Sequence, residues 1–403
     1  MKKQLKPSFY NDFKCVADKC EIICCENWNI FIDKKTYKKY MNLKGDIKKD
    51  IKQNIKINKE HESTWDYALV KLNNEKRCSL LNEQGLCRIH AELGEDMLSH
   101  TCKVYPRQNV KVGDIYEYNL SISCPEVAKK ALLGKEKFSF ILEEDYISKK
   151  EEREIGYVNL DEYCANLLWE VRKFSIEIIQ MRDIELWKRI VLLGLFCKEV
   201  DENLSDVNKF IDEIEKYRFM TSNEDILNSL NNIKINNDKK LNLLTQFVRS
   251  RINFVVNNDV FIEVCNDLDS ALGFGEEKSE EKIIENYTDI ENGIYKKFLV
   301  DNSHILENYL VNTIYREFIL FYAEKSFYNR FVKVIIQYSI ARFLLMGQLA
   351  TKKESFNNND IIKVFYSYSR VIEHNPVFID NLIAGLKQKG YDELNYMSIL
   401  IRE

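Results

Sequence analysis

Eight cysteines lie within the first 124 residues, and they are the side chains of this sequence best suited to bind a metal. They are Cys15, Cys20, Cys24, Cys25, Cys78, Cys87, Cys102 and Cys124. Thiolates hold zinc ions and iron–sulfur clusters when turns and adjoining strands bring them together. Because we find no secretion signal, so many cysteines argue for metal or chemistry rather than for disulfides. We therefore expect a cysteine-rich metal module over residues 1–135.

The cysteine spacing favours an iron–sulfur cluster over zinc. The pattern is C-x4-C-x3-C-C, then C-x8-C, then C-x14-C, and finally Cys124-Pro125. Structural zinc sites favour C-x2-C pairs, which this sequence lacks, whereas Cys-Pro occurs in ferredoxin motifs. Cys24 and Cys25 are adjacent, so their side chains cannot easily bind one ion together. The eight cysteines could therefore form two four-thiolate sites, or one site with additional structural or sensing thiols. We expect a 4Fe–4S cluster, with zinc as the alternative.

Other signatures of chemistry are missing or weak. The radical-type motif C-x3-C-x2-C begins at Cys20 and Cys24, but Asn27 occupies its third position. His90 and His100 flank cysteines and could be ligands, although supporting or surface roles fit them better. There is no P-loop, no H-E-x-x-H and no G-x-S-x-G. Cys164, Cys197 and Cys265 sit singly in apolar stripes and are expected to be small buried hydrophobes.

The segments that position the cysteines read as short strands and turns. The run 66–72 alternates, and the run 107–123 predicts a hairpin that turns at Val112-Gly113-Asp114. A helix is predicted over residues 35–44. A second helix should start after Pro125, with Glu126 in its first turn.

From about residue 161 the apolar period becomes helical. One stripe consists of Leu160, Tyr163, Cys164, Leu167, Leu168, Val171 and Phe174, and similar stripes continue to residue 372. Only four prolines and 13 glycines interrupt the chain. The best loop candidates are 228–238 and 275–281. We expect a mainly α fold: a small α+β metal module over 1–135 and a long multi-helix region over 136–403.

The charge and hydropathy indicate a soluble, cytoplasmic protein. Residues 1–130 carry 24 Lys and Arg against 18 Asp and Glu, and the remainder carries 35 against 45. The net charge of −4 gives no strong pull toward nucleic acid. No apolar run reaches transmembrane length, because Lys333 and Arg342 interrupt the best candidate, 332–346. We expect no membrane insertion, and the sequence leaves the oligomeric state open.

The cysteine segments resemble a group of putative zinc- or iron-chelating domains. The resemblance is carried by Cys24-Cys25, Cys78-Ser-Leu-Leu, Gly85-Leu-Cys87-Arg-Ile-His90, Cys102-Lys-Val-Tyr105-Pro106-Arg107 and Cys124-Pro125-Glu126. Leu80 stands where that group usually has Phe, and His90 where it usually has Tyr.

Over nearly the whole chain the sequence more closely resembles the flagellin lysine-N-methylase family. The similar segments include Trp28-Asn-Ile, Glu307-Asn-Tyr-Leu-Val-Asn312 and His374-Asn-Pro376. The resemblance implies methyl transfer from S-adenosylmethionine to lysines of flagellin, with an iron–sulfur cluster on the cysteine motif. A lysine must lose its proton before it attacks a methyl donor. Tyr105, Glu126 and Glu307 fit that role only loosely, since packing or surface charge accounts for them equally well, so the catalytic residues stay unassigned.

Two other functions use the same cysteines. The chain could be a non-catalytic zinc- or iron-binding module that holds a partner through its helical region. It could also be an electron-transfer or redox-sensing protein, which would change its visible absorption on reduction.

Overall fold

The computed structural model describes residues 1–20, 22–59, 63–152, 155–204, 207–252, 258–275 and 278–402. Residues 276 and 277 of the predicted loop 275–281, and residues 253–257 of the region of predicted helical stripes, lie outside the described residues. The strands are β1 (Lys2–Pro7), β2 (Phe31–Ile32), β3 (Ile55–Ile57), β4 (Ala68–Val70), β5 (Arg107–Val112), β6 (Ile115–Leu120), β7 (Phe140–Asp145) and β8 (Gly156–Val158).

Short helices accompany these strands, and long helices follow them. The short ones are α1 (Lys34–Met41), α2 (Asp46–Asn54), α3 (Arg88–Leu93), α4 (His100–Val104), α5 (Pro125–Leu132) and α6 (Lys149–Glu152). The later ones are α7 (Glu162–Ile179), α8 (Leu186–Glu202), α9 (Val207–Ser222), α10 (Glu224–Ser229), α11 (Asn237–Ile252), α12 (Asp259–Leu272), α13 (Glu280–Ile290), α14 (Lys296–Glu317), α15 (Phe321–Glu324), α16 (Phe327–Lys352), α17 (Asn358–Tyr368), α18 (Pro376–Gln388) and α19 (Leu394–Ile401). Two π-helical segments, η5 (Glu291–Tyr295) and η8 (Ser369–Glu373), interrupt them. The predicted mainly helical fold with a small N-terminal sheet region is confirmed.

The larger sheet has the strand order β7-β1-β6-β5-β8. β5 and β6 form the predicted hairpin, with Val112 paired to Ile115 across the turn. β1 runs parallel to β6 and antiparallel to β7, so the first strand lies inside the sheet. β7 and β8 follow residue 135 in the chain yet pair within this same sheet.

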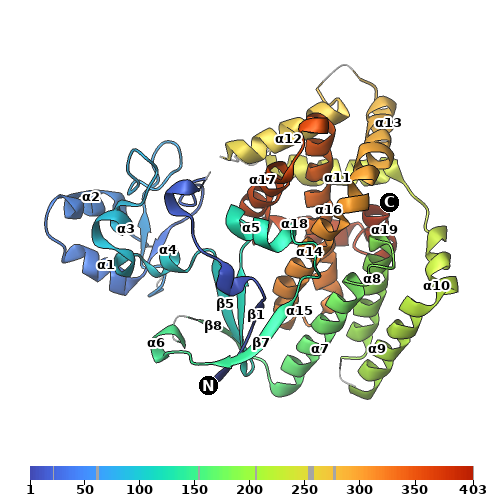
Figure 1. The fold of residues 1–403 in the computed structure, drawn as a ribbon, viewed down its shortest axis with the longest axis horizontal. Coiled ribbons are helices and arrows are strands. Elements are labelled where there is room, and N and C mark those ends of the chain that lie inside the picture. The colour runs from blue at the N-terminus through green and yellow to red at the C-terminus, as the bar shows by residue number, and fades with distance from the viewer. Residues whose placement is uncertain are drawn as a thin grey trace.

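The described residues form two hydrophobic cores. The smaller is built from β2, β3, β4 and their helices, around Ile51, Ala68 and Leu80, with Cys78 buried inside it. The larger joins the hairpin residues Val112 and Leu120 to the long helices. Figure 1 shows the blue N-terminal module, with α1 to α4, beside the helical body, and the larger sheet, in which β1, β5, β7 and β8 are labelled, between and below them.

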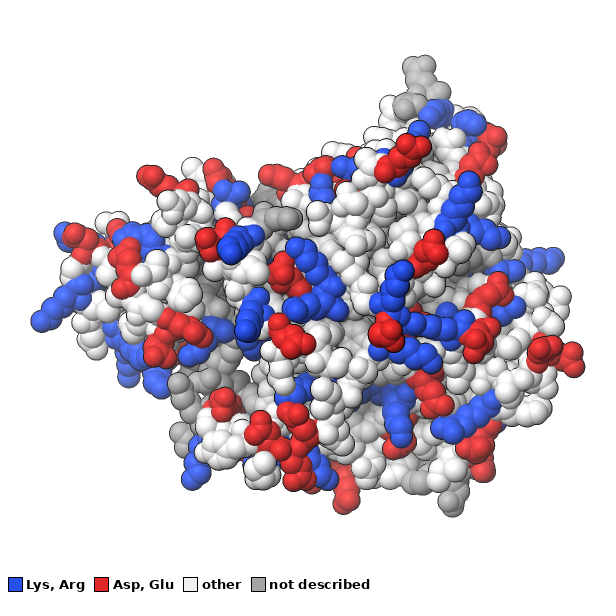
Figure 2. Space-filling model, viewed as in Figure 1, with Lys and Arg blue, Asp and Glu red and all other residues white. Residues whose placement is uncertain are grey.

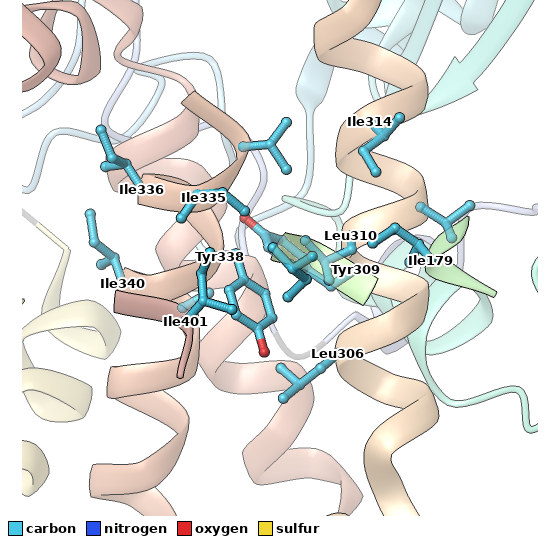
Figure 3. Close-up of a cluster of buried hydrophobic side chains, with 14 of the residues drawn as sticks. Ile179, Leu306, Tyr309, Leu310, Ile314, Ile335, Ile336, Tyr338, Ile340 and Ile401 are labelled. Atoms are coloured by element: carbon cyan, nitrogen blue, oxygen red, sulfur yellow. The ribbon is translucent and has the colours of Figure 1, made fainter. Parts of the chain in front are cut away.

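The helical body is organised around α16. Close to its centre, Tyr309 and Leu310 from α14 meet Ile335 and Tyr338 from α16 (Figure 3). The continuous helix Phe327–Ser355 is long and apolar enough to cross a membrane, but 89% of its most apolar window is buried inside the protein. Its apolar character is therefore explained by its place in the core, where other helices cover its surface.

Candidate functional site

Five of the predicted metal-ligating cysteines gather around the smaller core. Cys78 is buried there, and Cys25, Cys87 and Cys102 pack against the same cluster. The backbone N–H of Cys78 donates to the carbonyl of Cys25 at 2.9 Å, which holds the two loops together. The Sγ atoms of Cys24 and Cys25 lie 3.8 Å apart. Ser99 caps α4 through the N–H of Cys102, so a helix start fixes that thiol.

The surroundings of these thiols suit a bound cation. Burial, with a smaller contribution from the neighbouring thiol of Cys87, raises the pKa of Cys78 to about 11 against the opposing hydrogen bond from the backbone of Leu80. Burial likewise raises the pKa of Cys102 to about 12, with Cys87 and Cys78 adding to the effect. Thiolates of like charge repel one another, and a metal ion removes that repulsion by replacing their protons. The donor set therefore fits a thiophilic metal in its chemistry.

The other three predicted ligands, Cys15, Cys20 and Cys124, lie toward the helical body. Cys124 is the N-cap residue of α5. Burial raises its pKa to about 11, the N–H groups of Val127 and Glu126 oppose that rise, and the thiols of Cys20 and Cys15 add to it. The thiols of Cys15 and Cys20 are thus close enough to Cys124 to raise its pKa, as the thiols around the smaller core raise one another's.

No cysteine of the described residues is in a disulfide. Within the same residues, no three Cys, His, Asp or Glu side chains are arranged as a metal-binding group. The metal and its ligand set therefore stay predictions. The ring of His100 packs against that of Trp65, with centroids 4.7 Å apart and planes tilted by 55°, which gives that histidine a packing role.

A cavity of about 330 Å³ lies between the N-terminal module and the helical body. Trp28 and Tyr105 form an aromatic wall, with ring centroids 6.2 Å apart. Cys24, Lys76 and His374 are exposed, so the cavity opens to solvent. The remaining lining residues are Glu26, Asn27, Asn29, Leu72, Arg251, Asn258, Arg370 and Val371. Its size is at the lower end of the range of small-molecule sites.

The π-helical segment η8 supplies the wall of the cavity that belongs to the helical body. From it, Arg370 donates through Nε to the carbonyl of Ser123 at 3.1 Å and through Nη1 to the carbonyl of Ile23 at 3.0 Å. Each carbonyl immediately precedes a cysteine, Cys124 or Cys24. One guanidinium group therefore holds two cysteine-bearing loops against the helical body. Such π-helical insertions are frequent at functional sites.

A second connection runs through hydroxyl groups between two residues of the cavity wall, Tyr105 and His374. The Tyr105 hydroxyl lies 3.0 Å from Ser123 Oγ, which lies 2.8 Å from Ser121 Oγ. Ser121 Oγ in turn lies 3.1 Å from Nε2 of His374, the residue directly after η8. Both serines are almost completely buried, at 0% and 2% exposure.

The protonation states of His374 and Tyr105, the two ends of this hydrogen-bonded chain, follow from their surroundings. Burial of the imidazole, with Arg316 and Arg370 nearby, lowers the pKa of His374 against an opposing effect of Glu373. The ring is therefore neutral at pH 7 and can accept a proton. Burial raises the pKa of Tyr105 to about 12, so its phenol stays protonated.

The structure separates the residues singled out in the sequence. Trp28, Tyr105 and His374 come together at the cavity. Glu126 lies on α5 paired to Lys129, and Arg107 stacks over Phe13.

Glu307 lies elsewhere, and reading it as a helix-surface charge is wrong. Its side chain is 2% exposed and accepts hydrogen bonds from Arg182 and Arg189. Its buried position on α14 gives it two guanidinium partners, which makes it part of the framework.

Sequence reasoning missed Arg370, Ser121 and Ser123. Arg370 stands within an apolar helical stripe, where an arginine reads as a surface residue. Ser121 and Ser123 precede Cys124-Pro125, and their alternation with Ile122 matched the end of the predicted hairpin. Only proximity to a cysteine could have drawn attention to them.

Comparison with known proteins identifies the family. The family described as FliB lysine N-methylase C-terminal domain matches residues 172–400, from the middle of α7 into α19. The chain is 36% identical over 129 residues to the Flagellar biosynthetic protein FliU of Salmonella muenchen, covering 32% of this chain and 75% of that protein.

Two further relatives carry the name Lysine-N-methylase. They come from Salmonella choleraesuis and Salmonella typhimurium, and each is 36% identical over 129 residues, covering 32% of this chain and 32% of the relative. The matched segment thus spans about a third of either methylase. No solved structure matches the chain.

A helical body carrying a lysine N-methylase domain, joined to a cysteine-rich module through a shared cavity, defines the class of protein. The chain belongs to the FliB lysine N-methylase family, as the match over more than half of its length shows. The comparisons thus assign it to an enzyme family, and the predicted family resemblance is confirmed.

Proposed function

We propose that this protein is a cytoplasmic protein-lysine N-methyltransferase that acts on flagellin with S-adenosylmethionine as methyl donor. The observation that carries the proposal is the cavity between the two parts of the chain. Its wall joins Trp28 and Tyr105 of the cysteine-rich module to residues of the family domain. Aromatic faces attract cations within about 6 Å. Both the lysine ammonium and a sulfonium methyl donor are cations.

The charges around the cavity favour the reactive form of lysine. Lys76, Arg251 and Arg370 bring positive charge to it, and Glu26, its lining carboxylate, is held by Arg77 and Arg370. These cations oppose the aromatic attraction for the ammonium form of lysine, so they favour binding of the neutral amine. Cations near an amine disfavour its protonated form and lower its pKa. Once a proton has left, the nitrogen lone pair attacks the methyl carbon, the carbon–sulfur bond breaks, and its electron pair stays on sulfur.

We propose that the cysteines hold a 4Fe–4S cluster, with zinc as the alternative metal. The gathering of Cys24, Cys25, Cys78, Cys87 and Cys102 supports four-thiolate ligation near the cavity, and Cys15, Cys20 and Cys124 offer further thiols. A bound cluster would supply structural cross-linking and one-electron chemistry.

Two measurements test the proposal. Protein purified without oxygen should be brown and contain iron and acid-labile sulfide, whereas stoichiometric zinc without sulfide would overturn the cluster. The same protein, incubated with flagellin and S-adenosylmethionine labelled in its methyl group, should transfer label to lysine.

The matched control is Tyr146→Phe, which removes one phenolic hydroxyl from an exposed tyrosine outside the cavity lining. We expect Tyr105→Phe to lose activity and Tyr146→Phe to retain it. Absence of label on lysine with metal-loaded wild-type protein would refute the assignment and favour a metal-binding interaction module or a redox protein.

A further inference from the structure

We propose that Tyr105, Ser123, Ser121 and His374 form a proton relay that carries the substrate lysine's proton from Tyr105, in the half-buried wall of the cavity, to His374 at the exposed edge of the same cavity. This inference rests on the proposed methyltransferase function. Each methyl transfer from a sulfonium to a lysine ammonium releases one proton, because the product amine is again a cation. The relay gives that proton a path from the aromatic wall of the cavity to an exposed residue.

The geometry provides that path. Three consecutive contacts of 3.0, 2.8 and 3.1 Å link the phenol of Tyr105 to the imidazole of His374. The contacts are within the range of O–H···O and O–H···N hydrogen bonds. The two serines between them are buried, so their hydroxyl groups bond within the chain. His374 as a residue is exposed at the edge of the cavity, although neighbouring atoms desolvate its ring enough to lower its pKa, so a proton that reaches the imidazole can pass to water.

The direction of the hydrogen bonds agrees with proton transfer outward. A neutral imidazole protonated on Nδ1 presents Nε2 as an acceptor. Ser121 then donates to His374, Ser123 to Ser121, and Tyr105 to Ser123. Ser121 Oγ also accepts the backbone N–H of Ser123 at 3.4 Å, which leaves its hydrogen free to point toward the histidine. The phenol oxygen of Tyr105 keeps its lone pairs for the substrate.

The transfer balances step by step. The lysine ammonium gives one proton to the Tyr105 oxygen as the Tyr105 hydrogen passes to Ser123. The Ser123 hydrogen passes to Ser121, and that of Ser121 to Nε2 of His374. The imidazolium gives its Nδ1 proton to water, and each hydroxyl group still carries one hydrogen. The starting arrangement returns when the hydroxyl groups rotate and the imidazole changes tautomer. The lysine keeps the lone pair with which it attacks the methyl carbon.

The acidity of the histidine does not stop the relay. The lowered pKa of His374 makes its imidazolium a strong acid, so a proton that reaches the ring passes on to water readily. The cations at the cavity lower the pKa of the substrate lysine as well, which narrows the difference between the two groups. Arg316 and Arg370, opposed by Glu373, favour rapid release from the imidazolium.

Four variants test the relay in metal-loaded full-length protein. We expect His374→Ala and Ser123→Ala to lower kcat for flagellin about 100-fold, the lower limit for general acid–base groups, with KM changed less than about threefold. Because His374 is exposed, its variant should fold even where a buried serine variant does not. Added imidazole should restore activity to His374→Ala but not to Ser123→Ala. Ser175→Ala removes a buried hydroxyl that bonds only Val171 of its own helix and should keep full activity.

The outcomes separate the relay from the methyltransferase function. Wild-type protein that transfers no label refutes both. Wild-type protein that methylates lysine, with His374→Ala within about threefold of it in kcat, refutes the relay alone. A loss in His374→Ala confined to KM also overturns the relay, because it shows that the ring binds substrate. A kcat loss with imidazole rescue supports it.

Discussion

At the scale of single residues, Arg370 connects more of the candidate site than any residue singled out in the sequence. Its hydrogen bonds reach the carbonyls of Ile23 and Ser123, and its Nη1 lies 3.4 Å from Glu26. Its Nη2 is buried, with no hydrogen-bond partner within the described part of the chain. A planar guanidinium can serve two carbonyls at once, which an ammonium group cannot do in the same geometry.

Replacing Arg370 should weaken metal retention. Groups that support metal ligands typically contribute about 10- to 100-fold to affinity. We expect Arg370→Gln to lose metal to a chelator at least 10-fold faster than wild-type protein, and Arg370→Lys to be intermediate. Lys363→Gln breaks an ion pair with Glu263 remote from the cavity and should leave the rate unchanged. Equal rates in all four proteins would show that Arg370 does not support the metal site.

A second residue-scale prediction concerns acid stability. Asp33 caps α1 and also accepts the N–H of His100. Burial raises the pKa of its carboxyl, but hydrogen bonds from the N–H groups of Thr36 and His100 outweigh that effect and lower it below 3.8. A lowered folded-state pKa contributes stability above the unfolded-state value of about 3.9, and that stability is lost as pH falls through the folded value.

Asp33→Ala should therefore cost about 1–2 kcal/mol in the free energy of unfolding at pH 7. The cost should shrink as the pH falls below about 4. Urea titrations at several pH values measure both. A cost that stayed constant down to pH 3 would contradict the role given to the carboxylate charge.

At the scale of elements, the close approach of α12 to α16 depends on Gly347. A methyl group added there would lie 2.6 Å from the Cα of Leu268, which is backbone and cannot move aside alone. We expect Gly347→Ala to destabilise the protein by about 1–3 kcal/mol through overpacking.

Gly385 on α18 provides the matched control, because nothing lies within 4 Å of an added methyl group there. Gly385→Ala should stabilise the protein by about 0.5–1 kcal/mol, since alanine favours the helix. Thermal melting of both variants checks the contrast. Similar shifts for the two would show that α12 and α16 can move apart at no cost.

Elements with local signals were predictable and those with distant partners were not. The hairpin turn at Gly113, the helix after Pro125 and the long apolar stripes all appear where local pattern placed them. β1 and β7 escaped prediction because their pairing is set by one another and by β6, far along the chain. The same limit applies to the site: Arg370 and Ser123 meet across 247 residues.

At the scale of the whole molecule, a buried ion pair joins the sheet to the helical body. Glu117 of β6 accepts from Arg172 of α7 at 2.6 and 2.8 Å, and both side chains are nearly inaccessible. Trp169 also donates to Glu117 at 2.9 Å. On the face drawn in Figure 2, by contrast, charges of both signs are interspersed, as on an ordinary solvated surface.

Removing one partner of the Glu117–Arg172 ion pair should lower the free energy of unfolding substantially. We expect Arg172→Met to destabilise the protein by about 3–5 kcal/mol, because Glu117 would remain buried and charged. The double variant Arg172→Met, Glu117→Leu should recover much of that loss. Chemical denaturation of the set measures the coupling, and a double variant as unstable as the sum of the single ones would contradict it.

Because the cavity is shared, the affinity for a ligand should depend on how firmly the cysteine-rich module docks on the helical body. Neither the cysteine-rich module nor the helical body alone contains the full set of lining residues. If the docked arrangement were populated only a tenth of the time, the apparent Kd of any ligand would rise about tenfold with every lining residue intact. Substitutions at the junction can thus mimic the loss of a binding residue, and by reciprocity a bound ligand should draw the two bodies together.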